Sequence, residues 1–204
     1  DTSENWAELL PNNEVMVGNS WQDHGQGSDM GTLAFAHETL RPLGLKPEQI
    51  HLCLNDTSLT PNSGPSGGSR NNVVTGNAIR VSCENLLAAM KKADGTYRTY
   101  DEMKKEGIET KIYGKWTTPC TPCDVETGKG EPFCIYMYGL FMAEVEVDIT
   151  TGKASCYGFT HVGDVGTITN QLVVDGQMYG GLAQGIGLAL TEDFEMIKAH
   201  SNMI

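Results

Sequence analysis

The stretch Ser66-Gly67-Gly68-Ser69-Arg70-Asn71-Asn72 decides how this chain is interpreted, because it joins an apolar segment to a long apolar-periodic one. Its successive small residues leave main-chain N–H groups free to converge on an anion, and a following helix adds the positive end of its dipole. Arg70 would add a planar guanidinium that matches the geometry of a phosphate. The stretch therefore predicts a ligand that carries phosphate.

A second unit of strand, glycine-containing loop and helix precedes this stretch. We expect a strand at residues 14–17, then the loop Trp21-Gln22-Asp23-His24-Gly25-Gln26-Gly27, then a helix from Ser28 to about Leu40. Taken alone, the loop also matches an ordinary strand-to-helix turn. If the first strand and a predicted strand at 50–54 are parallel neighbours, both loops face the same way and could bind an extended polyanion.

The whole pattern predicts an α+β fold, with a two-layer arrangement of helices and a mixed or antiparallel sheet. Ile79, Cys83, Leu86 and Met90 recur at helical spacing and indicate a helix that continues to about residue 93. The charged and polar residues 96–109 suggest an exposed connection or a short helix. We expect a first lobe at residues 1–95, which carries both loops, and a second lobe at residues 110–204.

The second lobe is expected to begin with a strand at 110–116, followed by an irregular loop. A long hairpin at 133–149 and 154–162, with one solvated face, then leads to a glycine-rich helix from Asn170 or Asp175 to Ala199. Glycines inside a helix each cost about 1 kcal/mol relative to alanine. Either a closely packed helix or a bulky ligand would explain them, and the sequence leaves both explanations open. These glycines are Gly176, Gly180, Gly181, Gly185 and Gly187.

Composition limits the classes of partner. The 204 residues include 26 Asp and Glu against 14 Lys and Arg, a formal net charge of -12, so a phosphate must be held by local donors and nucleic acid is an unexpected partner. No apolar run approaches the roughly 20 residues that span a bilayer, so we expect no membrane partner. Six cysteines are too sparse for a disulfide scaffold, which favours a reducing compartment such as the cytoplasm.

Metal and nucleophile motifs are weak. Cys120-Thr121-Pro122-Cys123 lacks a second ligand pair for zinc, and the five histidines form no paired motif. We therefore expect neither metal ligands nor catalytic residues in this chain.

Three motifs together resemble the molybdenum hydroxylases, the xanthine oxidase family. They are the loop at 22–27, the run Ser63-Gly64-Pro65-Ser66-Gly67-Gly68-Ser69-Arg70, and the glycine-rich run at 175–187. The resemblance is nearest to bacterial aldehyde oxidoreductases that use molybdopterin cytosine dinucleotide. It extends over essentially the whole chain and suggests a fragment of the molybdopterin-binding domain of a larger enzyme.

The resemblance implies which residues contact that cofactor. They are Trp21, Gln22, Asp23, His24, Gly25, Gln26, Gly27, Ser66, Gly67, Gly68, Ser69, Arg70, Asn71, Asn170, Gln171, Gln177 and Gln184. Many relatives carry proline where this chain has Gln171, which leaves the contact there open.

The resemblance also implies a function. The parent enzyme would oxidise small-molecule aldehydes to carboxylic acids by water-derived hydroxylation at a molybdenum centre, with [2Fe-2S] clusters outside this chain and a homodimer as one possible assembly. The family's catalytic glutamate lies in a Gly-Val-Gly-Glu-type loop that does not occur before Ile204, so we expect the fragment alone to be inactive. A non-catalytic nucleotide-binding module and an assembly domain remain as alternatives.

Overall fold

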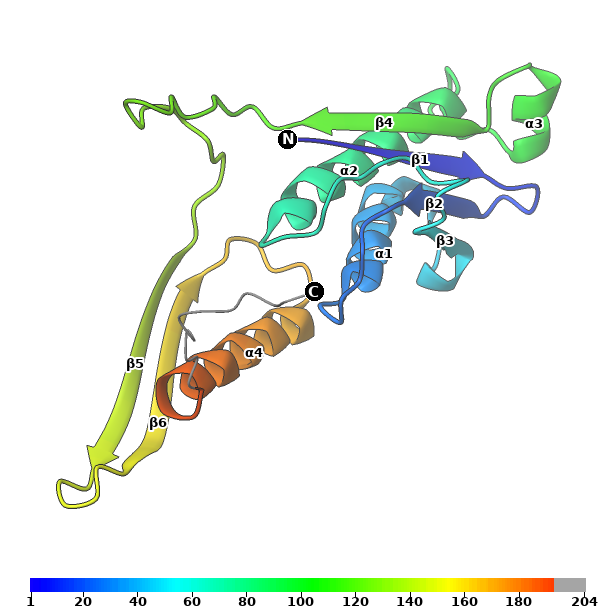
Figure 1. Cartoon of the computed structure of the whole chain (residues 1–204). Helices are drawn as coiled ribbons and strands as arrows, with labels where there is room; N and C mark the ends of the chain where they lie inside the picture. The colour runs from blue at the N-terminus through cyan, green and yellow to red at the C-terminus, as the bar shows by residue number, and fades with distance from the viewer. Residues whose placement is uncertain (193–204) are drawn as a thin grey trace. The chain divides into compact units, whose positions relative to one another are not determined.

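The computed structural model describes residues 1–192, and its contacts divide the chain into two compact units (Figure 1). The first unit spans Asp1–Ile135, and the second begins at Tyr136. The sequence places the division earlier, within residues 96–109. In the structure, strand β4 (Lys111–Thr117) pairs with strand β1 (Thr2–Leu9) of the first unit. Residues 110–135 therefore belong to the first unit and not to the second lobe that the sequence predicts.

The first unit is a two-layer fold in which helices cover one face of a mixed sheet. The strand order is β3-β2-β1-β4, where β1 is antiparallel to both β2 (Val15–Asn19) and β4. Strands β2 and β3 (Ile50–Leu54) run parallel. Helices α1 (Ser28–Thr39) and α2 (Arg70–Met90) pack together on the sheet (Figure 1). The predicted α+β class is confirmed.

Short helical segments connect these elements. The 3-10 helices η1 (Arg41–Leu43) and η2 (Pro47–Gln49) lead from α1 to β3. Helix α3 (Tyr100–Lys105) begins after Thr99, whose side chain accepts a hydrogen bond from the Glu102 N–H while the Glu102 carboxylate accepts one from the Thr99 N–H. This reciprocal capping explains why a polar stretch forms a helix there.

The core lies between the sheet and the two long helices. The apolar face predicted for α2 is buried, because Ile79, Cys83 and Leu86 are completely inaccessible and Met90 nearly so. The remaining buried members of the core are Ala7, Leu9, Val15, Val17, Trp21, Ala36, Leu40, Ile50 and Met103.

Strand β1 is the element that the apolar pattern does not predict. Its side chains facing the helices begin with two polar residues, Ser3 and Asn5, and only then become apolar. Both polar side chains are fully buried and paired: the Ser3 hydroxyl lies 3.1 Å from that of Thr75, and the Asn5 amide donates to the Gly18 carbonyl at 3.0 Å. Hydrogen bonding offsets their burial, so the strand forms without an apolar alternation.

The second unit contains an antiparallel hairpin and one helix. Strand β5 (Tyr138–Val147) pairs with β6 (Ala154–Asp164), with a register shift between Glu144 and Val145. Helix α4 (Gln171–Leu190) follows. The helix is confirmed through Leu190, while its predicted end at Ala199 lies outside the described residues.

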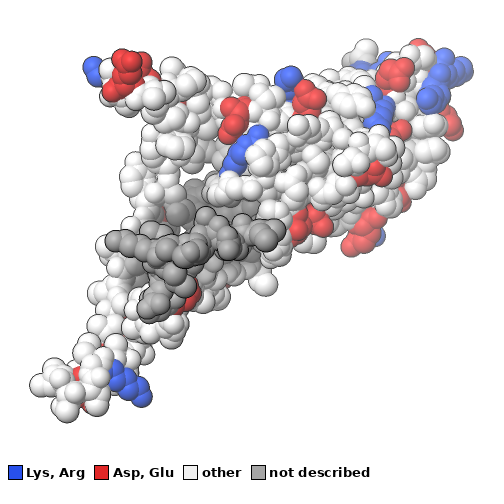
Figure 2. Space-filling model, viewed as in Figure 1, with Lys and Arg blue, Asp and Glu red and all other residues white. Residues whose placement is uncertain are grey.

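Both faces of the hairpin are exposed among the described residues, although the sequence predicts one buried face. Val145, expected to face inward, is 58% exposed, and Leu140 is 65% exposed. On the face seen in Figure 2, most of the hairpin is uncharged and charged side chains gather near its turn. The chain itself therefore supplies no cover for these apolar side chains within residues 1–192.

None of the helices formed by residues 1–192 combines the length and the apolar character that crossing a membrane requires.

Candidate functional site

The two glycine-containing loops, the first loop at residues 20–27 and the second loop at residues 55–69, leave the same edge of the sheet. Strands β2 and β3 are parallel neighbours in the register Val15↔Ile50 through Asn19↔Leu54, and each is followed by a loop that leads to a helix. The parallel pairing that the two-loop prediction requires is therefore confirmed, while the binding of a ligand by both loops stays a prediction. The carboxyl ends of parallel strands are a common place for ligands because helix N-termini converge there.

Side chains of the first loop hold the second loop in place. The Ser20 hydroxyl donates to the Pro61 carbonyl at 2.9 Å, and the Ser20 N–H donates to the Ser63 hydroxyl at 3.0 Å. The Gln22 carboxamide accepts the Ser66 N–H at 2.9 Å. Gln22, predicted as a ligand contact, is thus engaged in joining the two loops.

The first loop provides its own anion. The Asp23 carboxylate accepts hydrogen bonds from the N–H groups of Gly25 at 2.8 Å and Gly27 at 3.3 Å, and from Asp29 at 3.2 Å. The bond from the Asp29 main chain, followed by those from the two glycines, lowers the pKa of the Asp23 carboxyl. The N–H groups expected to contact a ligand at Gly25 and Gly27 are therefore occupied by a side chain of the same loop.

The second loop keeps its donors available. Among residues 1–192, no acceptor pairs with the N–H groups of Gly67, Gly68 and Ser69, nor with those of Asn71 and Asn72 in the first turn of α2. A β-carbon placed on Gly67 or Gly68 would meet no atom of the described residues within 4 Å. Gly68 has a φ of +52°, a left-handed conformation that favours glycine. A cluster of unused donors thus faces open space at a helix N-terminus.

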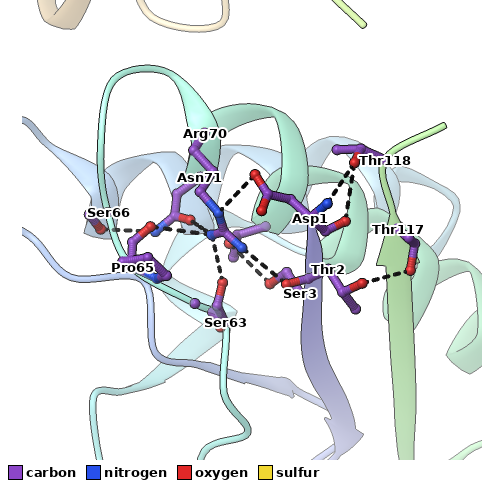
Figure 3. A network of polar contacts seen from close by, with 12 residues as sticks. Asp1, Thr2, Ser3, Ser63, Pro65, Ser66, Arg70, Asn71, Thr117 and Thr118 are labelled. Atoms are coloured by element: carbon purple, nitrogen blue, oxygen red, sulfur yellow. Dashed lines mark hydrogen bonds and ion pairs between the residues drawn. The ribbon is translucent and has the colours of Figure 1, made fainter. Parts of the chain in front are cut away.

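Arg70 is turned into the protein and away from that space (Figure 3). Its Nη1 donates to the carbonyl oxygens of Ser63 at 3.0 Å and Pro65 at 3.3 Å, and its Nη2 donates to that of Thr2 at 3.1 Å. The Nε atom lies 3.4 Å from the Asp1 carboxylate, and the side chain is only 16% exposed. Carbonyls of strand β1 and of the second loop, together with the Asp1 carboxylate, occupy the guanidinium donors here, so a contact between Arg70 and a phosphate stays a prediction that this arrangement does not favour.

Other predicted contacts divide between core and surface. Trp21 is 6% exposed and packs on Gly31, so its indole belongs to the core and not to the loop surface. His24 is exposed, and its main-chain N–H donates to the Gln26 carboxamide oxygen at 2.5 Å. Gln26 in turn donates to the Gln22 carbonyl at 2.9 Å. Asparagine 71 is buried, with its amide donating to the Ser66 hydroxyl at 2.9 Å.

Asp29, at the start of α1, is an acidic residue that the sequence does not single out. One of its carboxylate oxygens is buried and has no hydrogen-bond partner among residues 1–192. Burial, followed by the nearby charge of Asp23, raises the pKa of the Asp29 carboxyl. An added anion at the first loop would meet two carboxylates, which leaves the second loop as the better anion site.

A pocket of about 480 Å³, lined by uncharged residues, opens beside the loops. Its lining carries hydroxyl and amide groups and no charge, which suits a neutral hydrogen-bonding group. Asn55 at its edge has a φ of +57°, unusual for a residue with a side chain. The lining residues are Ser20, Gln22, Asn55, Thr57, Thr60, Pro61 and Asn62.

The second unit holds the remaining predicted contacts. Asn170 caps α4, because its side chain accepts the Val173 N–H at 3.3 Å, and the Gln171 amide donates to Asp175 at 2.7 Å. Gln177 and Gln184 line an open hollow of about 470 Å³ on the glycine side of the helix. Gly176, Gly180 and Gly181 complete that lining. A β-carbon at any of these glycines would meet no atom within 4 Å among the described residues.

Metal-ligating side chains are dispersed. No group of three or more His, Cys, Asp or Glu side chains within residues 1–192 could hold a metal ion. The six cysteines are free thiols, and burial raises the pKa of the Cys83 thiol to about 12. His161, on the hairpin, stacks on Phe141 with ring centroids 4.4 Å apart.

Comparison with known proteins places this arrangement in a family. A family model described as the molybdopterin cofactor-binding domain matches residues 1–202. The chain belongs to this family. Its open N–H cluster is consistent with that assignment, because molybdopterin carries a phosphate and the N–H groups at Gly67 and Gly68 lie at a helix N-terminus without an acceptor among residues 1–192.

Individual members of the family are similar to different degrees. The chain is 57% identical over 205 residues to the aldehyde oxidoreductase of Megalodesulfovibrio gigas, a match that covers 100% of this chain and 23% of that protein. It is 29% identical to the xanthine dehydrogenase/oxidase of Gallus gallus, over 88% of this chain and 14% of that protein. The solved aldehyde oxidoreductase of Desulfovibrio desulfuricans superposes with a TM-score of 0.93 at 60% identity, covering 96% of this chain and 21% of that one. The chain thus spans less than a quarter of each relative, as part of a cofactor-binding domain.

Proposed function

We propose that this chain binds the phosphate-bearing part of a molybdopterin cofactor through the second loop, within a longer aldehyde oxidoreductase. The observation that carries the proposal is the set of unused N–H groups at Gly67, Gly68 and Ser69, which continues into the first turn of α2. These donors and the helix dipole stabilise negative charge without any basic side chain. That arrangement suits a chain whose formal net charge is -12.

We propose the cytosine dinucleotide form of the cofactor. Such a ligand has a pyrophosphate, for which a row of adjacent N–H groups is better matched than a single donor pair. The uncharged pocket lined by Asn55, Thr57 and Asn62 lies near enough in the fold to share Gln22 with the two loops. Hydroxyl and amide groups there could hydrogen-bond a neutral part of the same ligand.

The residues of this chain would bind and orient the group. When bound, the molybdenum cofactor supplies oxidation–reduction chemistry, and aldehydes are the proposed substrates because of the 57% identity to an aldehyde oxidoreductase. Side chains that transfer protons and the [2Fe-2S] clusters would lie in the remainder of the parent enzyme, in the cytoplasm. Within this chain, the two joined loops fix the direction of the ligand.

The remainder of the parent enzyme is also the proposed partner of the second unit. Large side chains on both strands of the hairpin are exposed, including Leu140 at 65% and Val162 at 62%, and a patch of this kind is rare on the free surface of a monomeric protein. The relatives are more than four times as long as this chain, which leaves ample polypeptide to cover it. A homodimer of the parent is a further proposal that these apolar faces would accommodate.

The test is cofactor analysis of the full-length polypeptide that carries this chain. We expect molybdenum by elemental analysis, cytidine monophosphate after acid hydrolysis, and aldehyde-dependent reduction of an electron-accepting dye. Molybdenum without a released nucleotide would contradict the dinucleotide form. A nucleotide without molybdenum would favour a nucleotide-binding module instead, and turnover of purines without turnover of aldehydes would contradict the proposed substrate class.

A further inference from the structure

The guanidinium of Arg70 donates its hydrogen bonds to groups within the protein. A guanidinium has five N–H donors in a rigid plane, and here they reach three segments of the chain. These are strand β1 through the Thr2 carbonyl, the second loop through the Ser63 and Pro65 carbonyls, and helix α2 through the Asn71 side chain at 2.5 Å. Figure 3 shows Arg70 at the centre of this network, with its guanidinium among the carbonyls.

The second loop is folded closely over the guanidinium. Gly64 has a φ of +77°, and a β-carbon there would lie 2.4 Å from Nη2 and 2.7 Å from Cζ of Arg70. Position 64 therefore accepts glycine alone while Arg70 keeps its place. A residue that only attracted a phosphate would not need such a fit.

The contacts also fix the direction of the loop's N–H groups. Arg70 draws the carbonyls of Ser63 and Pro65 inward, and the Asn71 amide holds the Ser66 hydroxyl from the other side at 2.9 Å. The next residues, Gly67 and Gly68, bulge away from these anchors into open space. Holding the carbonyls on the inside leaves the N–H groups of the bulge on the outside.

We propose that Arg70 is a positioning residue that braces the second loop from within, so that the N–H groups of Gly67, Gly68 and Ser69 are presented to the ligand. This inference rests on the proposed function and deepens it: ligand affinity comes from main-chain dipoles, and Arg70 supplies geometry instead of a ligand-facing charge. Gly64 is part of the same arrangement, because the absence of a side chain there leaves room for the Arg70 guanidinium.

Substitutions separate geometry from charge. Arg70→Ala removes both, whereas Arg70→Lys keeps a positive charge but provides an ammonium with three donors, which cannot reach the same set of carbonyls. Gly64→Ala keeps the arginine and displaces its guanidinium. We expect all three full-length variants to retain less than a tenth of the wild-type molybdenum per folded polypeptide. Arg80→Lys and Arg80→Ala, on the exposed face of the same helix where Arg80 pairs with Glu84, are the matched controls and should retain it.

The positioning role of Arg70 would be overturned if lysine at position 70 preserved the molybdenum content. If Arg70→Lys keeps more than half of the molybdenum while Arg70→Ala loses it, the charge is what matters. If Arg70→Ala keeps its molybdenum, the residue has no such role. Circular dichroism and thermal unfolding identify any variant that fails to fold. If an Arg70 variant does not fold, the molybdenum content of Gly64→Ala tests the proposal in its place.

Amide hydrogen exchange tests the brace without the cofactor. In cofactor-free protein, we expect Arg70→Lys to raise exchange across residues 63–72 and to leave α1 unchanged. Unaltered exchange there would overturn the inference. Wild-type protein that lacks molybdenum would instead contradict the proposed function, and the exchange result would still decide the brace.

Discussion

The Gln22 carboxamide accepts the main-chain N–H of Ser66 at 2.9 Å and so joins the two loops at the edge of the parallel strand pair. The Ser66 hydroxyl lies at the same distance from the Gln22 carboxamide oxygen and 3.1 Å from the Gln22 carbonyl. Gln22 thus joins the loops through three hydrogen bonds to Ser66, beside those that Ser20 makes to Pro61 and Ser63, which makes its removal informative.

Replacing Gln22 by alanine should loosen both loops. The Ser66 N–H would lose its acceptor, and an unsatisfied polar group of this kind costs about 1–3 kcal/mol of unfolding free energy. We expect a loss in that range by urea denaturation, with a severalfold lower molybdenum content. Gln49→Ala, which removes the acceptor of the Lys46 N–H in the η2 turn before strand β3, is the control for cofactor content and should leave it unchanged. Full cofactor content in Gln22→Ala would show that the loops are held by other contacts.

Asp23→Asn should change how stability depends on pH. Hydrogen bonds from the Asp29, Gly25 and Gly27 main chain lower the folded-state pKa of Asp23, so its contribution is fully present above the unfolded value of about 3.9 and is lost as pH falls through the lower folded pKa. The variant should therefore have a lower thermal unfolding midpoint at pH 7, and the gap to wild type should close in acid. A gap that is independent of pH would contradict the charge-based account; exposed Glu109→Gln is the control.

Asp29→Asn should act in the opposite direction. Burial and the charge of Asp23 raise the folded-state pKa of Asp29, so its favourable contribution is present below the unfolded pKa and is lost as pH rises through the folded one. At pH 7 the ionised carboxylate is unfavourable, and its replacement should raise the unfolding midpoint. The gain should vanish in acid, where the carboxyl of the wild type is protonated. Calorimetric scans at several pH values would measure the difference in unfolding midpoint between Asp29→Asn and the wild type. A lower midpoint for the variant at pH 7 would refute the prediction.

Gly18→Ala should destabilise the first unit. The Trp6 indole lies on Gly18, and a β-carbon at position 18 would fall 2.1 Å from its Cε2. Because Trp6 is 2% exposed and donates to the Leu59 carbonyl at 2.9 Å, it cannot move without breaking that bond. We expect a loss of about 1–3 kcal/mol, the usual effect of overpacking. Gly158→Ala, whose β-carbon would lie 3.7 Å from its nearest described neighbour, should cost much less in the same denaturant titration.

Much of the site could be predicted from sequence because its signals are local. The apolar segments ending at Asn19 and Leu54, the glycines that follow them and the apolar repeat of α2 give the paired strand, loop and helix units. The parallel pairing of β2 with β3 brings the loops together. This pairing is a property of the sheet and has no local signal in either unit.

The roles of individual side chains could not be predicted in the same way. Arg70 bonds to the carbonyl of Thr2, 68 positions earlier, and the first half of strand β1 has no apolar signal because Ser3 and Asn5 face the helices there. The role of Asp23, in contrast, had a local signal. An aspartate two residues before a glycine often accepts that glycine's N–H, as Asp23 does from Gly25. The exposed hairpin depends on polypeptide outside this chain, so no pattern within the chain could identify what covers it.

If the N–H groups at Gly67 and Gly68 hold the phosphate end of the cofactor, the molybdenum content of full-length Gly67→Val should fall. A β-carbon at this position would meet no atom within 4 Å among residues 1–192, so the variant should fold with an unchanged unfolding midpoint in its cofactor-free form. We predict less than a tenth of the wild-type molybdenum per polypeptide, because the valine would fill the space of the ligand. Wild-type molybdenum content in the folded variant would contradict the account.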